Sequence, residues 1–398
     1  MLQTLQRAWM IALLATPSIL PAAAMTTIDL FRSGTGGYAL YRIPGLIVTS
    51  KGTLLAYSEA RKSERGDWVP IDIMLRRSTD GGSTWSEPKS IARVAGEHRK
   101  NPVALAQNLA NPTDVTYNNP VAIPDRNGSV HVIFCLEYMR AFYMRSNDDG
   151  KTFSGPVEIT TTFDRFRPEY DWRVIATGPG HGIQLRNGRL LIPIWMSTGT
   201  GGHAHRPSVT STIYSDDHGK SWQRGEIAVP NTEQWVHPNE TAAEQLADGQ
   251  VLLNVRSESK ENRRLLVTSP DGATKWSRPR FNDQLLEPVC FGSMARLSLR
   301  PKTRLLFSNP DTLERTGSPA EPGKNRDRKN LTVQLSYDEG GTWPVKKVIE
   351  AGWSGYSDLA VSKDGTIYCF FERGSGTRAL TLARFDLDWL TDGKDALK

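Results

Sequence analysis

The feature that most constrains the fold of this chain is a short turn-like motif that recurs along it. The motif reads Ser, any residue, Asp, any residue, Gly, any residue, Ser or Thr, and then Trp or Phe. Four copies occupy residues 78–85, 146–153, 215–222 and 336–343. The Asp side chain can accept hydrogen bonds from following backbone N–H groups, and the Gly supplies a residue with positive φ. The motif therefore predicts β-hairpin turns, with the aromatic residue starting the next strand and packing beneath the turn.

A fifth, degenerate copy occupies residues 269–276. It keeps Asp271 and Trp276 but has Ala273 where Gly is expected. The five copies begin 68, 69, 54 and 67 residues apart. Recurrence at such a spacing indicates one supersecondary unit that is repeated along the chain.

Strand-like runs lie between the copies, and several follow Asp-Gly or Asn-Gly turns, a strong hairpin signal. They are residues 54–57, 130–135, 190–194, 251–255, 305–307 and 366–371. All-β units of this size are typical of a propeller with four-stranded antiparallel blades. We therefore predict an all-β, six-bladed β-propeller that occupies residues 25–398 as a single domain, with the two termini sharing the last blade. A solenoid or a sandwich with similar turns is the alternative.

The first residues have the pattern of an export signal. Arg7 is followed by an apolar run at 8–20 and by three alanines at 22–24. We expect residues 1–24 to be a signal peptide, because the run is short for a membrane anchor and contains Pro17 and Pro21. The mature protein would then be exported, to the periplasm or the medium, without an integral membrane segment.

Composition narrows the functional classes. The chain has 398 residues, and its 49 basic and 43 acidic residues give a formal net charge of +6 that is spread along the sequence. A nucleic-acid-binding protein usually has a clustered basic stripe, so we expect no nucleic-acid partner. His203 and His205 lack further metal ligands, and we interpret them as surface-loop residues; no cofactor and no metal are expected. Cys135, Cys290 and Cys369 are expected to be free buried thiols, although one disulfide stays open.

A second motif is more specific than the turns. Tyr41-Arg42-Ile43-Pro44 precedes the first turn, and together with the turns it resembles the Arg-Ile-Pro motif and aspartate boxes of bacterial-type exo-α-sialidases of the retaining class. The resemblance extends over residues 28–383. Aspartate boxes also occur in non-catalytic propellers, so the Arg-Ile-Pro motif and the positions that follow carry the functional inference.

The resemblance assigns three positions to the reaction: Asp67 as the acid/base, Tyr356 as the nucleophile and Glu240 as the base that activates it. Glu244 lies four positions after Glu240, and the choice between these two glutamates stays open. The resemblance also implies four substrate-binding arginines, which are Arg42, Arg61, Arg256 and Arg328. Glu372 is implied to hold Arg42 in place. We also expect Asn119 to contact the sugar ring.

The chemistry of sialic acid explains this choice of residues. Its anomeric carbon carries an ionised carboxylate, which Arg42, Arg256 and Arg328 can hold because a guanidinium is always charged and can bind two oxygens. Only a closed propeller could bring three such distant arginines together. A carboxylate nucleophile would be repelled by the substrate, and sialidases are a recognised exception that uses Tyr. A phenol with a pKa near about 10 needs a neighbouring base such as Glu240.

The predicted function is hydrolysis of terminal sialic acids from glycoconjugates, with retention and through a tyrosine nucleophile. The expected partners are sialylated glycans, glycoproteins or glycolipids, and the expected oligomeric state is a monomer. Three alternatives stay open: a propeller that binds glycans without chemistry, a glycosidase for another 2-keto sugar acid, and transfer to another acceptor. Linkage preference is not determined by these motifs.

Overall fold

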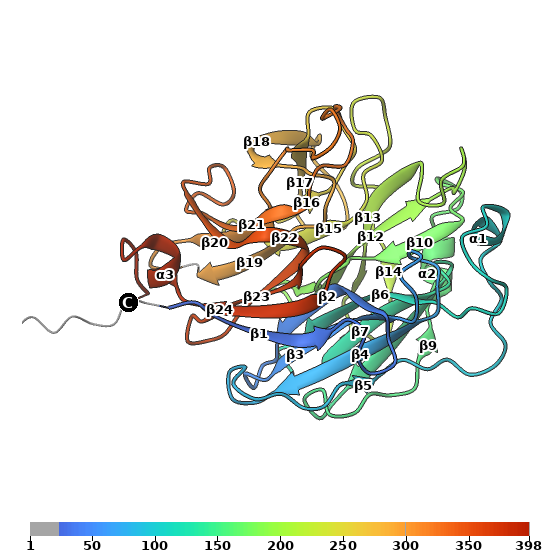
Figure 1. The fold of residues 1–398 in the computed structure, drawn as a ribbon, viewed down its shortest axis with the longest axis horizontal. Helices are drawn as coiled ribbons and strands as arrows, with labels where there is room; N and C mark the ends of the chain where they lie inside the picture. The colour runs from blue at the N-terminus through green and yellow to red at the C-terminus, as the bar shows by residue number, and fades with distance from the viewer. Residues whose placement is uncertain (1–23, 299, 398) are drawn as a thin grey trace, which may run out of the picture.

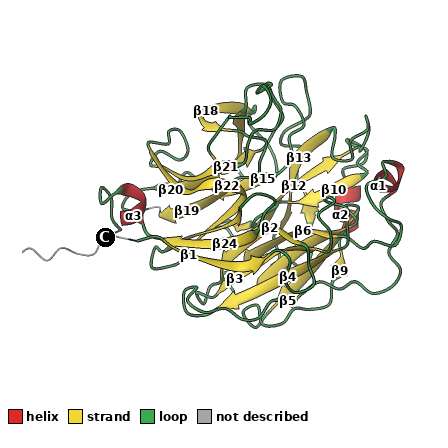
Figure 2. Ribbon diagram, viewed as in Figure 1, coloured by secondary structure: helices red, strands yellow, loops and turns green. Residues whose placement is uncertain are grey.

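The computed structural model describes residues 24–298 and 300–397. The predicted signal peptide, residues 1–24, lies outside this range except for the exposed Ala24. None of the helices in the described range is long and apolar enough to cross a membrane. The three helices there are single short turns at the periphery (Figure 2), at α1 (Pro102–Ala106), α2 (Thr160–Asp164) and α3 (Leu387–Thr391).

The described strands form five antiparallel sheets. The first sheet consists of β2 (Leu40–Val48), β3 (Leu54–Arg61), β4 (Ile71–Ser78) and β5 (Lys89–Ser90). The second consists of β6 (Tyr117–Pro124), β7 (Val130–Leu136), β8 (Arg140–Ser146) and β9 (Val157–Glu158). The third consists of β10 (Val174–Thr177), β11 (Ile183–Gln184), β12 (Leu190–Ser197), β13 (Ser208–Ser215) and β14 (Gln223–Arg224). The fourth consists of β15 (Thr241–Gln245), β16 (Val251–Val255), β17 (Arg263–Ser269) and β18 (Arg280–Leu286).

The fifth sheet has seven strands and includes both ends of the described chain. Its strands are β19 (Ser293–Ser298), β20 (Arg304–Pro310), β21 (Lys329–Ser336), β22 (Val345–Val361), β23 (Ile367–Arg373), β24 (Ala379–Phe385) and β1 (Thr26–Arg32). The long strand β22 changes partner along its length. It pairs with β21 from Val345 to Trp353 and with β23 from Ser354 to Val361. The predicted pairing of the two termini is observed, because β1 lies beside β24.

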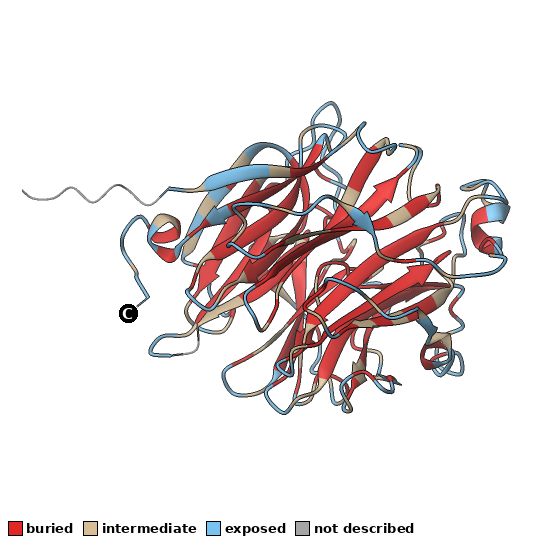
Figure 3. Cartoon of the chain, turned by 90° about the horizontal axis from the view of Figure 1, so that it is seen from below, coloured by how far each residue is buried: buried red, intermediate tan, exposed pale blue. Residues whose placement is uncertain are grey.

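The sheets follow one another around the molecule in chain order, from β2–β5 to β19–β24 (Figure 1). Most strand residues are buried (Figure 3), and buried side chains of neighbouring sheets belong to the same clusters. The joining pairs, taken in order around the molecule, are Leu55 with Phe134, Ile133 with Ile192, Leu191 with Leu253, Leu252 with Leu305, and Phe370 with Leu46. The last pair closes the ring. Cys135 and Cys290 lie in two of these clusters and Cys369 in a further cluster within the seven-stranded sheet; all three are free buried thiols, as predicted.

The repeated motif forms the turns predicted for it. In the turn at 78–85, Asp80 accepts the backbone N–H of Thr84 at 2.9 Å, and the N–H of Gly82, which has φ of +86°, donates to Ser78 Oγ at 2.9 Å. The degenerate copy is tighter by one residue, since Gly272 donates to Ser269 Oγ at 3.0 Å and Asp271 accepts from Ala273. Ala273 therefore does not break the turn. The aromatic residue does not start the next strand as predicted, because that strand begins one to four residues later.

These turn carboxylates predict an acid-sensitive stability. Hydrogen bonds from Thr84 lower the pKa of Asp80 to about 2, and although burial opposes ionisation of Asp217, bonds from Ser221 lower its pKa to about 2. Both folded pKa values lie below the unfolded value of about 3.9, so the stabilisation is complete above about pH 4 and is lost as the pH falls toward 2. We expect the thermal unfolding midpoint to fall across this window, and to fall less in Asp217→Asn, which has no charge to lose. If the unfolding midpoint of Asp217→Asn fell with pH as much as that of the wild type, the turn carboxylates would not be the source of the acid sensitivity.

Candidate functional site

A bulge in strand β2 positions the first arginine of the site. Arg42 pairs with Glu59 on β3, and the next pair is Gly45 with Tyr57. Strand β2 therefore has one more residue than β3 between these two pairs. Ile43 adopts φ of +58°, an unfavourable value for a β-branched residue. Gly45 is required because a Cβ there would lie 2.0 Å from the Tyr57 ring. The Arg-Ile-Pro motif is therefore the sequence of a strained bulge, a device that re-aims side chains in a sheet.

The same bulge recurs in strand β6. Asn118 pairs with Cys135, the next pair is Val121 with Ile133, and Asn119 adopts φ of +50°. Asn118 therefore occupies the position that Arg42 has in β2. Asn119 is buried, and its backbone N–H donates to Glu59 at 2.9 Å.

Three guanidinium groups surround one phenol. The guanidinium carbons of Arg42 and Arg328 lie 5.2 and 5.1 Å from the centroid of the Tyr356 ring. Arg256 Nη1 donates to the Tyr356 hydroxyl oxygen at 2.7 Å. Arg42 lies in β2, Arg256 directly follows β16, and Arg328 directly precedes β21. Three different sheets therefore contribute the arginines. Ring closure therefore brings side chains up to 314 residues apart around Tyr356, whose own position is in β22.

Glu240, and not Glu244, is the glutamate beside the phenol. The Tyr356 hydroxyl donates to Glu240 Oε1 at 2.6 Å, while the other oxygen of Glu240 accepts from Arg256. Glu244 lies further along β15, where its carboxylate accepts the backbone N–H of Gln245 and faces Arg296 and His181. Burial raises the pKa of Tyr356 well above its ordinary value, and this outweighs the opposing effect of Arg256, so the phenol keeps its proton at neutral pH.

Glu372 holds the Arg42 side chain and two backbone segments in place. Its oxygens accept from Arg42 Nε at 2.9 Å and Nη2 at 3.2 Å, and from the backbone N–H groups of Ile43 and Tyr356 at 3.2 and 3.1 Å. This close approach requires Gly355, since a Cβ there would lie 2.2 Å from the carboxylate. Although burial opposes ionisation, Arg42 keeps the pKa of Glu372 below its usual range.

Removal of this carboxylate should be costly. We expect Glu372→Ala to lower the free energy of unfolding by about 3 kcal/mol, because it leaves a largely buried guanidinium and two backbone N–H groups without their acceptor. Glu372→Gln keeps the shape and one acceptor oxygen, so its loss should be smaller. Denaturant titration of both variants measures the difference. A loss below about 1 kcal/mol in Glu372→Ala would mean that the brace is not structural.

Asp67 lies at the mouth of the site, in the loop between β3 and β4. It is the most exposed of the predicted catalytic residues, with 39% of its side chain accessible. Arg61 Nη1 donates to it at 2.7 Å, and Arg42 Nη1 lies 3.9 Å away. Burial opposes ionisation, but the Arg61 guanidinium keeps the pKa of Asp67 well below its usual range. In the ligand-free protein Asp67 is therefore a carboxylate.

Arg61 is buried, and its guanidinium bonds to three groups of the protein. It donates to Glu59 at 2.6 and 3.1 Å, to the carbonyl of Gly66 and to Asp67. These contacts tie the middle of the loop that carries Asp67 to strand β3. Sequence reasoning did not single out Glu59, although it lies two residues before Arg61, the spacing that puts two strand side chains on one face.

Several donors of the arginine cluster remain available. Within the described residues, Arg42 Nη1, Arg256 Nη2 and Arg328 Nη1 donate no hydrogen bond, and Arg328 Nη2 contacts only the carbonyl of Val289. The arrangement can therefore accept an anion with two or more oxygens beside the Tyr356 hydroxyl.

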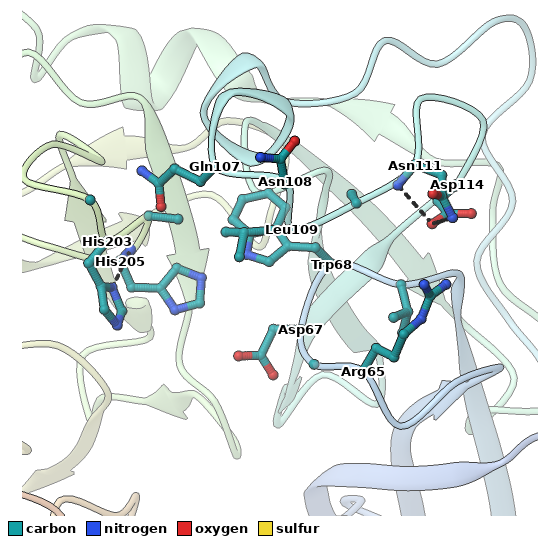
Figure 4. Close-up of a pocket in the computed structure, with 15 residues that line it drawn as sticks. Arg65, Asp67, Trp68, Gln107, Asn108, Leu109, Asn111, Asp114, His203 and His205 are labelled. Atoms are coloured by element: carbon teal, nitrogen blue, oxygen red, sulfur yellow. Dashed lines mark hydrogen bonds between the residues drawn. The ribbon is translucent and has the colours of Figure 1, made fainter.

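A cluster of aromatic rings from the first three sheets lies beside Asp67 (Figure 4). The rings of Trp68, Tyr138 and Trp195 surround His205, with centroids 5.2 to 5.7 Å from the histidine ring. His205 lies in a loop, as predicted, but it is only partly exposed, and its Nε2 atom is buried. Nothing in the local sequence signals this, since the contacts come from three separate segments.

Comparison with known proteins agrees with the geometry. Residues 52–369 match the model of the BNR repeat-like domain. The chain is 31% identical to a sialidase of Micromonospora viridifaciens over 92% of its own length and 54% of that protein, and 30% identical to a sialidase of Bacteroides fragilis over 85% and 61%. The chain thus spans between about half and two thirds of the length of these relatives. Among solved structures, the Hadza microbial sialidase Hz136 superposes with a TM-score of 0.73 at 26% identity, covering 92% of this chain and 69% of that one.

Proposed function

The chain belongs to the BNR repeat-like family, in which its relatives are sialidases, and we propose that it is an exo-α-sialidase that hydrolyses terminal sialic acids from glycoconjugates. One observation carries the proposal. The Tyr356 hydroxyl lies 2.6 Å from Glu240, and the guanidinium groups of Arg42, Arg256 and Arg328 surround the same ring. A non-catalytic glycan-binding propeller would not need a buried phenol paired with a carboxylate.

In the proposed mechanism, the three arginines hold the substrate carboxylate, so the anomeric carbon lies over the Tyr356 oxygen. That oxygen attacks the anomeric carbon as Glu240 takes the phenol proton, and the bond to the leaving oxygen breaks as Asp67 gives that oxygen a proton. Water then attacks the tyrosyl-glycosyl intermediate while Asp67 removes its proton. Glu240 returns a proton to Tyr356, so the enzyme is regenerated, and two displacements give retention.

Asp67 must carry a proton to act as the acid, although it is ionised in the free protein. The substrate carboxylate supplies the reason for the change. Arg61 is the main cation that keeps Asp67 ionised, and Arg42 adds to its effect; once the substrate carboxylate offsets the charge of Arg42, the pKa of Asp67 rises from its ligand-free value. Arg61 keeps the carboxylate in place in both states, which we propose as its main role.

The finer architecture also belongs to the proposal. The change of partner along β22 divides the seven-stranded sheet into two four-stranded halves, which supports six blades in a single domain over residues 25–398. Export and a monomeric state are proposed on the sequence alone.

The test is to incubate the purified protein with an α-sialoside and follow the reaction by NMR. Free sialic acid that appears first as the α anomer is the expected result. First appearance of the β anomer would contradict retention. A product that joins sialic acid to another hydroxyl would favour transfer, and an unchanged substrate would favour the non-catalytic alternative.

A further inference from the structure

The strand that carries the proposed nucleophile is irregular at that point. The register of β22 against β23 shifts between Ser354 and Ser357, so Tyr356 lies in a bulge. A bulge interrupts the ladder of backbone hydrogen bonds, and other contacts must then hold the bulged residues in position. The same is true of Arg42 in β2. The distance between the nucleophile and this arginine therefore depends on how two bulged strands are held together.

One buried carboxylate ties these two strands to each other. Asp358 lies two residues after Tyr356 in β22, and its side chain has 0% solvent exposure. Its Oδ2 atom accepts the backbone N–H of Leu46 at 2.8 Å, and Leu46 lies just beyond the bulge in β2. Asp358 thus fixes the segment that carries Tyr356 against the segment that carries Arg42. The mechanism described above gives this carboxylate no role.

The other oxygen of Asp358 binds two further segments. Its Oδ1 atom accepts from His181 Nδ1 and from Ser293 Oγ, each at 2.8 Å. Ser293 Oγ also accepts the backbone N–H of Leu359 at 3.1 Å, so β19 holds β22 by two bonds. Gly180 leaves room for this arrangement, since a Cβ there would lie 3.0 Å from Asp358 Oδ1. Asp358 therefore joins segments of the first, third and fifth sheets.

His181 can change the strength of this junction, because its ring can gain or lose a proton. Burial opposes protonation, but the Asp358 carboxylate, with a smaller contribution from Glu244, raises the pKa of His181 above its ordinary value of about 6.5. Glu244 of β15 is itself opposed by Arg296 of β19, and Tyr57 of β3 donates to the backbone carbonyl beside the ring. Since 14% of the His181 side chain is accessible, its proton can exchange with water. The contact with Asp358 is therefore an ion pair at low pH and loses that charge as the pH rises.

We propose that Asp358 is a positioning residue for the reaction: it holds Tyr356 in place relative to the arginines that bind the substrate, and most firmly while His181 is protonated. The inference rests on the proposed function, because it concerns the approach of the Tyr356 oxygen to the anomeric carbon. Asp358 is buried and acts only through the strands that it joins. Turnover should therefore depend on a proton that no step of the reaction consumes.

Asp358→Asn tests the positioning role. The amide keeps the shape of the carboxylate, but its nitrogen is a donor, so at least one of the three groups that donate to Asp358 loses its acceptor. With the 4-nitrophenyl α-sialoside, we expect kcat to fall by about 10- to 100-fold, as a displacement of the nucleophile by about 1 Å would cause. KM should stay similar, because the arginines keep their own carboxylate partners.

Asp125→Asn is the matched control. Asp125 is an equally buried carboxylate that accepts from His131 and His218, but within the described residues it makes no bond to β2, β19 or β22. Its kcat should equal that of the wild type, and circular dichroism verifies that both variants fold. If Asp358→Asn does not fold, Ser293→Ala takes its place, and loss of the hydroxyl should lower kcat by about 2- to 10-fold. Wild-type kcat in the folded variant, or an equal loss in Asp125→Asn, overturns the positioning role.

His181→Gln tests the proton, since Gln can still donate to Asp358 but has no charge to lose. In the wild type, kcat for the aryl substrate should fall by about 2- to 10-fold as the pH rises through the pKa of His181, which NMR of the histidine rings locates. This substrate needs no proton on its leaving group, so the acid role of Asp67 does not produce the step. The ion pair also stabilises the fold below about pH 6.5, so the unfolding midpoint should fall over the same range.

Both changes should be absent in His181→Gln, and a step in kcat that persists there overturns the role of the proton. The outcomes for the two proposals are separate. Failure of the wild type to release nitrophenol contradicts the proposed function, whereas an active wild type with an unchanged kcat in folded Asp358→Asn contradicts this inference alone.

Discussion

Tyr356→Phe should lose about 1,000-fold or more in kcat on a natural sialoside, because the only atom removed is the proposed nucleophile. The phenyl ring would still pack against Phe291 and beneath Arg42 and Arg328, so the fold and the substrate affinity should change little. Steady-state kinetics should therefore show a fall in kcat with a KM of similar size. Near-normal turnover would refute the assignment of the nucleophile.

The matched control for this variant is Tyr368→Phe. The Tyr368 hydroxyl donates to the carbonyl of Gly81 at 3.2 Å, in the turn at 78–85 and away from the site, so its loss should leave kcat unchanged. A sialic acid with fluorine at carbons 2 and 3 provides an independent readout. Mass spectrometry should find it attached to the peptide that contains Tyr356 in the wild type, and attachment at any other residue would contradict the mechanism.

Asp67→Ala should have the second large effect, and its size should depend on the leaving group. On a natural sialoside we expect kcat to fall by about 10²- to 10⁴-fold, the usual contribution of general acid–base catalysis. On the 4-nitrophenyl sialoside the loss should be smaller, because nitrophenolate leaves without a proton. The difference separates proton donation from simple distortion of the site.

Glu64→Ala is the control for Asp67→Ala, since Glu64 is an exposed carboxylate of the same loop and should be neutral for both substrates. Added azide or formate should partly restore the Asp67→Ala rate on the aryl substrate by replacing the base of the second step. Equal losses on the two substrates, without rescue, would mean that Asp67 positions the site and does not transfer protons.

The strand-and-turn architecture was predictable because its causes are local. An Asp that accepts N–H groups within four residues and a Gly at positive φ determine each turn, whatever the rest of the chain does. The degenerate copy also forms a turn, because Gly272 lies one position earlier and its N–H donates the equivalent hydrogen bond to Ser269. The resemblance to sialidases similarly identified Arg42, Tyr356 and Glu372 before any contact was known.

The contacts between segments were not predictable. No local pattern distinguishes Glu240 from Glu244, and only the geometry of β15 against β22 puts Glu240 Oε1 at 2.6 Å from the phenol. The contacts of Arg61 with Glu59, Gly66 and Asp67 were likewise not predictable from the local sequence. The burial of His205 depends on three aromatic rings from separate sheets and loops.

What the amino-acid sequence determined by itself was the repeating unit, the turns and the kinds of side chain available for chemistry. Those properties depend on backbone conformations and hydrogen bonds between near neighbours. The tertiary structure alone decided which carboxylate faces which cation, which arginine donors stay available, and which strands meet at Asp358. These depend on ring closure, which brings side chains hundreds of residues apart within hydrogen-bond distance, and on burial, which no short segment can produce alone.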